Sequence, residues 1–194
     1  MSAIFHAGIS GARGRMGRAV STVLDAREDV VVAARFDRGE MPDLSLCDVI
    51  IDFSTPDASV ELARTCAERG GPALVIGSTG LTAEQEAEIH EAAEKIAIVR
   101  SGNFSLGVNI LIGLVEHAAQ RLDAADGDIE VLETHHRRKA DAPSGTALML
   151  GEAAANGRDV DLADVRSAPY DGITGVRETG RIGFASLRAG APPP

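Results

Sequence analysis

The chain has 194 residues, 44% hydrophobic and 25% charged, a balance typical of a globular protein with one large or two small domains. Its formal net charge of -10 and the 3% of aromatic residues, none of them Trp, argue against a nucleic-acid partner. No apolar run is long enough to span a bilayer and no signal-peptide pattern is visible, so we expect no membrane partner and a cytoplasmic location.

Strand and helix patterns alternate from Ala3 to about Ser101. Strands are expected at Ala3–Ser10, Val30–Arg35, Val49–Phe53, Ala73–Ile76 and Ile96–Val99. Helices are expected at Met16–Ala26, at Ala58–Arg69 after Pro56, and from the N-cap Thr82, with Gln85 completing a capping box, to about Lys95. This alternation predicts an α/β fold: a Rossmann-like, doubly wound parallel sheet with helices on both faces.

The alternation stops at Gly102–Ser105, where we place the domain boundary. Residues 1–103 are predicted to form a dinucleotide-binding domain, and residues 104–194 a smaller α+β domain for substrate binding and oligomerisation. Its expected elements are a helix at Gly107–Arg121, a strand at Ile129–Glu133, a polar loop at His135–Ser144, a helix at Gly145–Ala155, a loop at Asn156–Pro169 and short β pieces within Val176–Arg188.

A glycine-rich turn, Gly11–Gly17, follows the first strand and opens the first helix. In dinucleotide-binding folds such glycines allow a tight turn, close approach of the backbone to a pyrophosphate, and close packing of helix on strand. The helix N-terminus then offers free N–H groups to the phosphates, and Arg13 and Arg15 add local positive charge. The alternative is a bare turn with solvated arginines.

The end of the second predicted strand carries Asp37 and Arg38, twenty residues past the turn. A carboxylate at that position hydrogen-bonds a ribose hydroxyl of NAD, whereas an arginine pairs with the 2′-phosphate of NADP. The two side chains favour different cofactors, so we predict NADH with NADPH also tolerated. The turns Asp52–Thr55 and Gly77–Gly80 also end parallel strands, where they either flank the nicotinamide or serve as ordinary turns.

The segment Glu133–Ala147 is the most unusual stretch, because two adjacent histidines are followed at once by three cations. A histidine can donate a proton near neutral pH, and the helix start at Ser144–Thr146 can bind a carboxylate. A solvated charged loop is an equally good interpretation of the residues alone. A metal site is disfavoured, because neighbouring histidines do not easily chelate one ion and the cysteines, Cys47 and Cys66, have no metal-ligand spacing.

Four segments together resemble the 4-hydroxy-tetrahydrodipicolinate reductase family, formerly dihydrodipicolinate reductase. They are Gly11–Gly17, Gly77–Gly80, Ser101–Asn109 and Glu133–Ala147. The resemblance extends over nearly the whole chain, through Gly183-Phe184 and Arg188–Gly190. It implies an enzyme of lysine and diaminopimelate biosynthesis that uses NADH or NADPH to reduce (2S,4S)-4-hydroxy-2,3,4,5-tetrahydrodipicolinate to tetrahydrodipicolinate, with loss of water.

The resemblance also implies roles for individual residues. His135 matches the family's proton donor and Lys139 its catalytic, substrate-binding lysine. His136, Gly145 and Thr146 match groups that hold the substrate carboxylates. The positions that match cofactor contacts are Gly11, Arg15, Met16, Asp37, Arg38, Gly77, Thr79, Ser101 and Phe104. No role is assigned to His6, His90 or His117.

Family members usually form homotetramers through the sheet of the second domain, and they normally run on past the position of Arg188–Gly190. We therefore expect a second domain that is short at its C-terminus. An incomplete second sheet would leave an exposed edge and would affect tetramer assembly and activity. Two other interpretations are another two-domain NAD(P) dehydrogenase, acting on an amino acid or sugar, and a non-catalytic nucleotide-binding remnant of the fold. The first would lack the His-His…Lys…Ser-Gly-Thr segment, and the second would bind NADH without consuming it.

Overall fold

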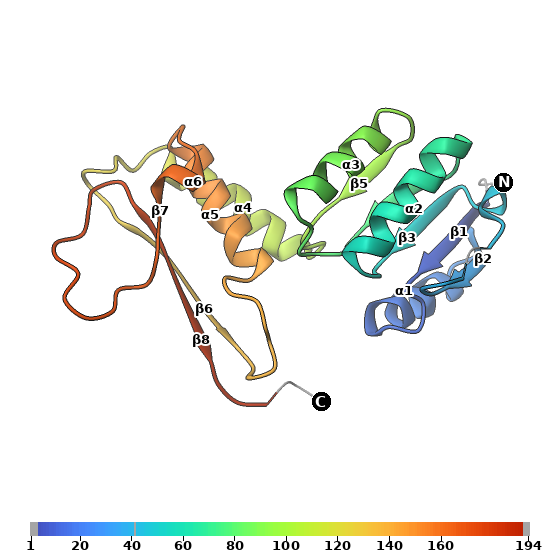
Figure 1. Ribbon diagram of the computed structural model, residues 1–194, viewed down its shortest axis with the longest axis horizontal. Helices are drawn as coiled ribbons and strands as arrows, with labels where there is room; N and C mark the ends of the chain where they lie inside the picture. The colour runs from blue at the N-terminus through green and yellow to red at the C-terminus, as the bar shows by residue number, and fades with distance from the viewer. Residues whose placement is uncertain (1–3, 41, 192–194) are drawn as a thin grey trace. The chain divides into compact units, whose positions relative to one another are not determined.

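The structure, a computed structural model, describes residues 4–40 and 42–191, and it divides into two compact units, Met1–Gly102 and Asn103–Pro194 (Figure 1). Ala3, where we expected the first strand to begin, lies outside the described residues. Each unit has its own buried apolar cluster and is described by itself. No helix within the described ranges has the length and apolarity needed to cross a membrane.

The first unit is built on a parallel sheet with the strand order β2-β1-β3-β4-β5. Its strands are β1 (Phe5–Ser10), β2 (Val30–Phe36), β3 (Val49–Asp52), β4 (Ala73–Ile76) and β5 (Ile98–Arg100). In this order β2 lies on one side of β1, and β3, β4 and β5 follow one another on its other side. The order therefore reverses between β1 and β3, the place where open α/β sheets bind ligands at the strands' carboxyl ends.

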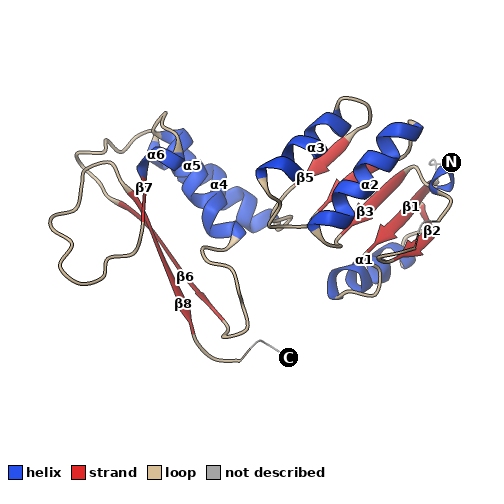
Figure 2. Cartoon of the chain, in the orientation of Figure 1, coloured by secondary structure: helices blue, strands red, loops and turns tan. Residues whose placement is uncertain are grey.

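The helices of this unit are α1 (Arg15–Asp25), α2 (Pro56–Arg69) and α3 (Ala83–Ala93), with a short 3-10 helix, η1 (Leu44–Leu46), before β3. Right-handed crossovers in opposite directions put α1 on one face of the sheet and α2 and α3 on the other, as Figure 2 shows. The predicted doubly wound α/β fold is confirmed. Residues of β1, β3 and β4 that are almost completely buried form the centre of the sheet: Ile9, Ile50, Leu74 and Ile76.

Local signals placed most boundaries correctly. Pro56 lies at the start of α2, and Thr82 and Gln85 form both hydrogen bonds of the predicted capping box. The fifth strand was predicted too early, since it begins at Ile98 and not at Ile96. The N–H of Ile96 donates to Ala92 O and so extends the end of α3, while pairing with β4 begins only where Leu74 N donates to Ala97 O.

The second unit contains a parallel sheet in the order β6-β8-β7. Its elements are α4 (Leu106–Ala119), β6 (Ile129–His135), α5 (Gly145–Gly157), α6 (Leu162–Val165), β7 (Arg166–Ser167) and β8 (Ile182–Arg188). Residues of α4, α5 and α6 share an apolar cluster with one face of this sheet. Gly151 lets α5 approach closely, because a Cβ there would overlap the ring of Phe184.

Two sequence predictions for the part of this unit after α5 begins were wrong. The segment Asn156–Pro169, expected to be a loop, holds the end of α5, all of α6 and β7. The short β pieces expected within Val176–Arg188 are one strand, β8, which pairs with β6 along its whole length. These elements are short, and contacts with partners distant in sequence stabilise them more than local patterns do.

Candidate active site

The glycine-rich turn of the first unit is shaped by backbone contacts that leave no room for side chains. Gly11 has a φ of 73°, and a Cβ there would lie 2.5 Å from the carbonyl oxygen of Phe53 at the end of β3. A Cβ on Gly17 would overlap the carbonyl of Gly11. The N–H groups of Gly11 and Ala12 both donate to Phe36 O, which ties the turn to the end of β2. The turn therefore lies at the switch point of the sheet.

The first turn of α1 opens directly from this glycine turn. Gly14 is its N-cap and offers no side-chain cap, and the first turn contains no acidic residue. Arg15 and Met16 follow and are exposed, Met16 by 50%. Uncapped N–H groups at the positive end of a helix, with an arginine beside them, suit a phosphate ligand.

Asp37 and Arg38 come directly after β2, beside the glycine turn. Oδ2 of Asp37 accepts a hydrogen bond from the backbone N–H of Arg13 at 3.1 Å. The Arg13 side chain lies against Glu40, with Nη2 2.5 Å from Oε1, so much of its positive charge is neutralised within the protein. That guanidinium also lowers the pKa of Glu40. Arg38 is exposed.

A cavity of about 170 Å³ adjoins these residues. Its lining comes from the ends of β1 and β2, the segments after β2 and β3, and the first half of α2: Ser10, Phe36, Asp37, Arg38, Gly39, Glu40, Ser54, Ala58, Glu61 and Leu62. The cavity lies at the carboxyl ends of the strands, on the side where Asp37 would meet a ribose.

The turns after β3 and β4 are joined by a buried polar chain. The hydroxyl of Ser59 donates to Asp52, and Ser59 Oγ lies 2.7 Å from Ser78 Oγ. All three residues are at most 5% exposed. Gly77 is required here, because a Cβ would collide with the ring of Phe53. The network fixes the Gly77–Gly80 turn at the carboxyl edge of the sheet.

Three further predicted cofactor positions lie at or beyond that edge. Thr79 is exposed in the turn after β4, and Ser101 follows β5, where its N–H donates to Ile76 O. Phe104, 44% exposed, belongs to the second unit. The first unit thus gathers all the predicted cofactor positions except Phe104 along one edge of its sheet.

In the second unit, one face of the sheet changes from apolar to polar along the strands. Ile129 and Val131 of β6 and Ile182 and Phe184 of β8 pack in the core. Further along the same strands, the side chains alternate onto this face as four polar groups: Glu133, His135, Ser186 and Arg188. The carboxyl ends of two parallel strands thus carry a cluster of polar and charged groups.

Glu133 is the centre of this cluster. Its carboxylate accepts hydrogen bonds from Ser144 N at 3.0 and 3.1 Å and from Ser186 Oγ at 2.7 Å. His135 Nδ1 lies 3.5 Å from Oε2, and Arg188 Nη1 3.9 Å from Oε1. Burial alone would raise the pKa of Glu133, but the hydrogen bonds from Ser144 and Ser186 and the charge of His135 outweigh it and lower the pKa. Glu133 therefore remains ionised at neutral pH.

His135 is the last residue of β6, whereas we expected it to open the following loop. Its side chain is 32% exposed, yet Nδ1 is buried, and no described residue makes a hydrogen bond with it. The exposed area therefore belongs to the rest of the ring, which includes Nε2.

The loop after β6 carries the other predicted catalytic group. Nζ of Lys139 lies 2.7 Å from both carboxylate oxygens of Asp141, and this lysine lowers the pKa of Asp141. The Arg188 guanidinium donates to the carbonyl oxygens of Lys139, at 3.3 Å, and of Asp141. His136 Nδ1 accepts from Arg138 N, which leaves Nε2 for other partners. The loop that presents Lys139 is thus held to β8 by Arg188.

The N-terminus of α5 completes the site. Ser144 is its N-cap and accepts from Ala147 N, and Gly145 and Thr146 form the first turn. Asn103 Nδ2 donates to Thr146 Oγ1 at 3.0 Å and so fixes that hydroxyl. A helix start with a hydroxyl, next to His135, His136 and Lys139, can bind a carboxylate.

The described structure brings the five predicted substrate and catalytic residues together at the β6 end and the α5 start. Sequence reasoning missed four residues that organise them: Asn103, Glu133, Ser186 and Arg188. Glu133 lay inside the segment that attracted attention, two residues from His135, and that spacing along a strand puts the two side chains on one face. No local signal could have found Ser186 or Arg188.

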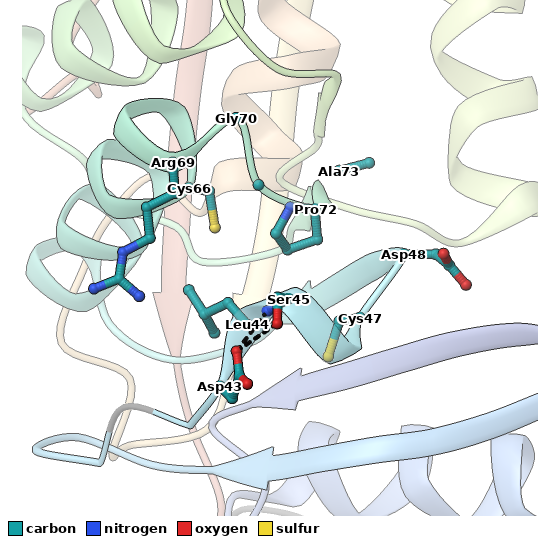
Figure 3. Close-up of a pocket in the computed structure, with 11 residues that line it drawn as sticks. Asp43, Leu44, Ser45, Cys47, Asp48, Cys66, Arg69, Gly70, Pro72 and Ala73 are labelled. Atoms are coloured by element: carbon teal, nitrogen blue, oxygen red, sulfur yellow. Dashed lines mark hydrogen bonds between the residues drawn. The ribbon is translucent and has the colours of Figure 1, made fainter.

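Another cavity, of about 440 Å³, lies before the amino ends of β3 and β4, near both cysteines (Figure 3). Burial raises the pKa of Cys66 to about 11 and also raises the pKa of Cys47. Both thiols are therefore protonated at neutral pH and are poor nucleophiles. The described residues that line this cavity include no histidine or lysine, unlike those at the end of β6.

Comparison with known proteins agrees with this arrangement. The sequence family described as "Dihydrodipicolinate reductase, N-terminus" matches residues 41–104, and "Dihydrodipicolinate reductase, C-terminus" matches residues 107–193. A structure titled dipicolinate-bound dihydrodipicolinate reductase, from Paenisporosarcina sp. TG-14, superposes with a TM-score of 0.67, covering 97% of this chain and 79% of that one. At 24% identity it shows a shared fold.

Two curated relatives are more similar in sequence. The 4-hydroxy-tetrahydrodipicolinate reductase of Caulobacter vibrioides is 58% identical over 191 residues, which cover 94% of this chain and 74% of that protein. The enzyme of the same name from Chelativorans sp. is 48% identical over 208 residues, covering 94% and 75%. These matches confirm the family and the reductase class predicted from the sequence. The chain belongs to the dihydrodipicolinate reductase family.

Proposed function

We propose that this protein catalyses the NAD(P)H-dependent reduction of 4-hydroxy-tetrahydrodipicolinate to tetrahydrodipicolinate, with loss of water, in lysine and diaminopimelate biosynthesis. The observation that carries the proposal is the polar end of the β6–β8 sheet. There His135 lies beside an ionised Glu133, the next loop carries three cations, and the first turn of α5 has the Thr146 hydroxyl and no acidic residue. This combination supplies both a proton donor and groups that neutralise a dicarboxylate.

A pyridine nucleotide fits the first unit, because its glycine turn is a tight backbone turn without side chains at Gly11 and Gly17, and its α1 N-terminus has no side-chain cap. Gly11, Arg15 and Met16 would hold the pyrophosphate, and Gly77, Thr79, Ser101 and Phe104 the nicotinamide half. The bound cofactor supplies the hydride. Asp37 would hydrogen-bond the ribose of NADH and Arg38 would pair with the 2′-phosphate of NADPH, so we propose that NADH is used and NADPH tolerated.

The substrate-binding residues neutralise the negative charge of the substrate. Gly145 N, Thr146 and His136 hold the substrate carboxylates, and Lys139 binds one of them or balances the charge that develops during reduction. His135 would donate the proton that balances the negative charge brought to the conjugated imine by the cofactor's hydride, and the substrate's 4-hydroxyl group leaves as water in the overall reaction. Cation density in the loop explains how a chain of net charge -10 can accept a dianion.

His135→Gln tests the assignment most directly. We expect turnover to fall about 100- to 1,000-fold, because general acid catalysis is lost, with little change in NADH affinity. Turnover is followed by NADH absorbance with freshly generated cyclic imine, and affinity by fluorescence titration. His117→Gln, an exposed histidine of α4, is the matched control.

Unchanged turnover in His135→Gln would remove His135 from the donor role. NADH binding by the unaltered chain without any consumption would favour the non-catalytic alternative. We further propose a homotetramer and a cytoplasmic location, as the family resemblance implies. Light scattering of the purified chain tests the assembly.

A further inference from the structure

The contact between His135 and Glu133 leaves one ring nitrogen of the histidine without a hydrogen bond among the described residues. Nδ1 of His135 is buried and lies 3.5 Å from Oε2 of Glu133. That distance is too long for a normal hydrogen bond, and among the described residues Nδ1 has no hydrogen-bond partner. Buried ring nitrogens without partners are rare, and catalytic hydrogen bonds are often long before a substrate is bound.

Hydrogen bonds from two other elements hold the carboxylate of Glu133 in a fixed position beside the His135 ring. Ser144 N binds both of its oxygens, and Ser186 Oγ binds Oε1. These partners come from the start of α5 and from β8, so three elements fix the carboxylate position. Oε2 is the oxygen nearest His135.

The other charged groups around His135 lie in different directions. Arg188 of β8 reaches toward Oε1 of Glu133 and toward the carbonyls of the loop. Lys139 is paired with Asp141, and His136 Nδ1 is occupied by Arg138 N. Glu133 is thus the carboxylate against which the buried side of the His135 ring lies.

We propose that Glu133 is a positioning residue for His135. Its carboxylate accepts a hydrogen bond from Nδ1–H of the imidazole, which orients Nε2 outward as the nitrogen that delivers the proton. The same carboxylate compensates the positive charge of the protonated ring. A carboxylate that orients a catalytic histidine in this way sets which nitrogen carries the proton. This inference rests on the proposed reductase function for its consequence in turnover, but the tautomer of His135 can be tested without it.

The first experiment reads the tautomer by NMR of the 194-residue chain with 15N-labelled imidazoles, at a pH where His135 is neutral. The resonances are assigned by their loss in His135→Gln. We expect the Nδ1–H form in the unaltered chain and loss of that form in Glu133→Gln. The Nε2–H form in the unaltered chain would overturn the proposal, and this measurement needs no variant of Glu133 to fold.

The second experiment is a double-mutant cycle in turnover with Glu133→Gln, His135→Gln and the double variant. Gln keeps an oxygen that can accept from Ser144 N, so the α5 start is preserved. We expect Glu133→Gln alone to lower kcat about 10- to 100-fold with KM nearly unchanged, and to cost nothing further in the His135→Gln background. Glu152→Gln, exposed on α5, is the matched control.

The outcomes separate the two proposals. Additive losses, or a loss confined to KM, would show that Glu133 acts only on structure and would overturn the positioning role. If the unaltered chain consumed no NADH but its His135 carried the Nδ1–H in a Glu133-dependent manner, the proposed function would fail while the contact proposed here stood.

Discussion

The cofactor edge of the first unit and the polar end of the second unit's sheet are both built at the carboxyl ends of parallel strands, but from different material. The first uses backbone: glycines without room for a Cβ and an uncapped helix start. The second uses side chains with formal charge, gathered around Glu133. Backbone N–H groups bind a pyrophosphate well, whereas a proton transfer needs side chains that titrate. The two edges should therefore respond to different kinds of substitution.

The largest effect is expected at the backbone site, from Gly17→Ala. The added methyl group would overlap the carbonyl of Gly11, so the turn must move. We expect a loss of stability of about 3 kcal/mol and at least about a 100-fold loss of NADH affinity, measured by thermal unfolding and by titration.

The control for that substitution is Gly113→Ala, also within a helix but with nothing within 4 Å of the new Cβ. It should stabilise α4 by about 1 kcal/mol, since alanine is the better helix former. Similar effects of the two substitutions would contradict the close packing inferred for the glycine turn.

At the side-chain site, Arg188→Met should release the loop that carries Lys139. Arg188 donates to the carbonyls of Lys139 and Asp141, and methionine keeps much of the volume without these hydrogen bonds. We expect KM for the imine substrate to rise about 10- to 30-fold, equivalent to about 1–2 kcal/mol, with NADH affinity unchanged. Arg121→Met, at an exposed position, should leave both constants unaltered. A fall in NADH affinity without a rise in KM would contradict the assignment of Arg188 to the substrate site.

A smaller effect should follow from Asp37, the carboxylate that follows β2 at the backbone site. Asp37→Asn keeps the size and an acceptor for Arg13 N but removes the charge that repels a 2′-phosphate. We expect the ratio of kcat/KM for NADPH to that for NADH to rise about 10-fold, about 1.4 kcal/mol. Arg38→Ala should move the same ratio in the opposite direction. If neither substitution changed it, cofactor choice would lie elsewhere.

The smallest effect concerns pH and the ionised Glu133. Its pKa is lowered in the folded chain from an ordinary value of 4.5, so its hydrogen bonds stabilise the fold at neutral pH. That contribution is lost as the pH falls through the lowered value, because both states are then protonated. We expect Glu133→Gln to be less stable than the unaltered chain at pH 7, by on the order of 1 kcal/mol, with the difference shrinking in acid. Urea unfolding at several pH values measures it, and a constant difference would contradict this origin.

Local patterns predicted most of the first unit. The capping box of Thr82 and Gln85, Pro56 at a helix start and the spacing of Gly11–Gly17 act over a few residues, so they can be recognised without a partner. The alternation of strands and helices then leaves one arrangement with right-handed crossovers, the doubly wound sheet. The sequence singled out His135, Lys139 and Thr146 because they lie in one unusual segment, and the roles proposed for them come from the family resemblance.

Tertiary structure alone decided what surrounds them. Ser186 and Glu133 are 53 residues apart, and they meet because β8 pairs in parallel with β6. The pairing of β5 with β4 and of β7 with β8 likewise depends on partners distant in the chain. The sequence by itself determined the glycine turn and the cations of the loop, since backbone sterics and charge are properties of local residues. The partners that hold the Glu133 carboxylate beside His135 depend on the register of β8 against β6, and no local pattern encodes that register.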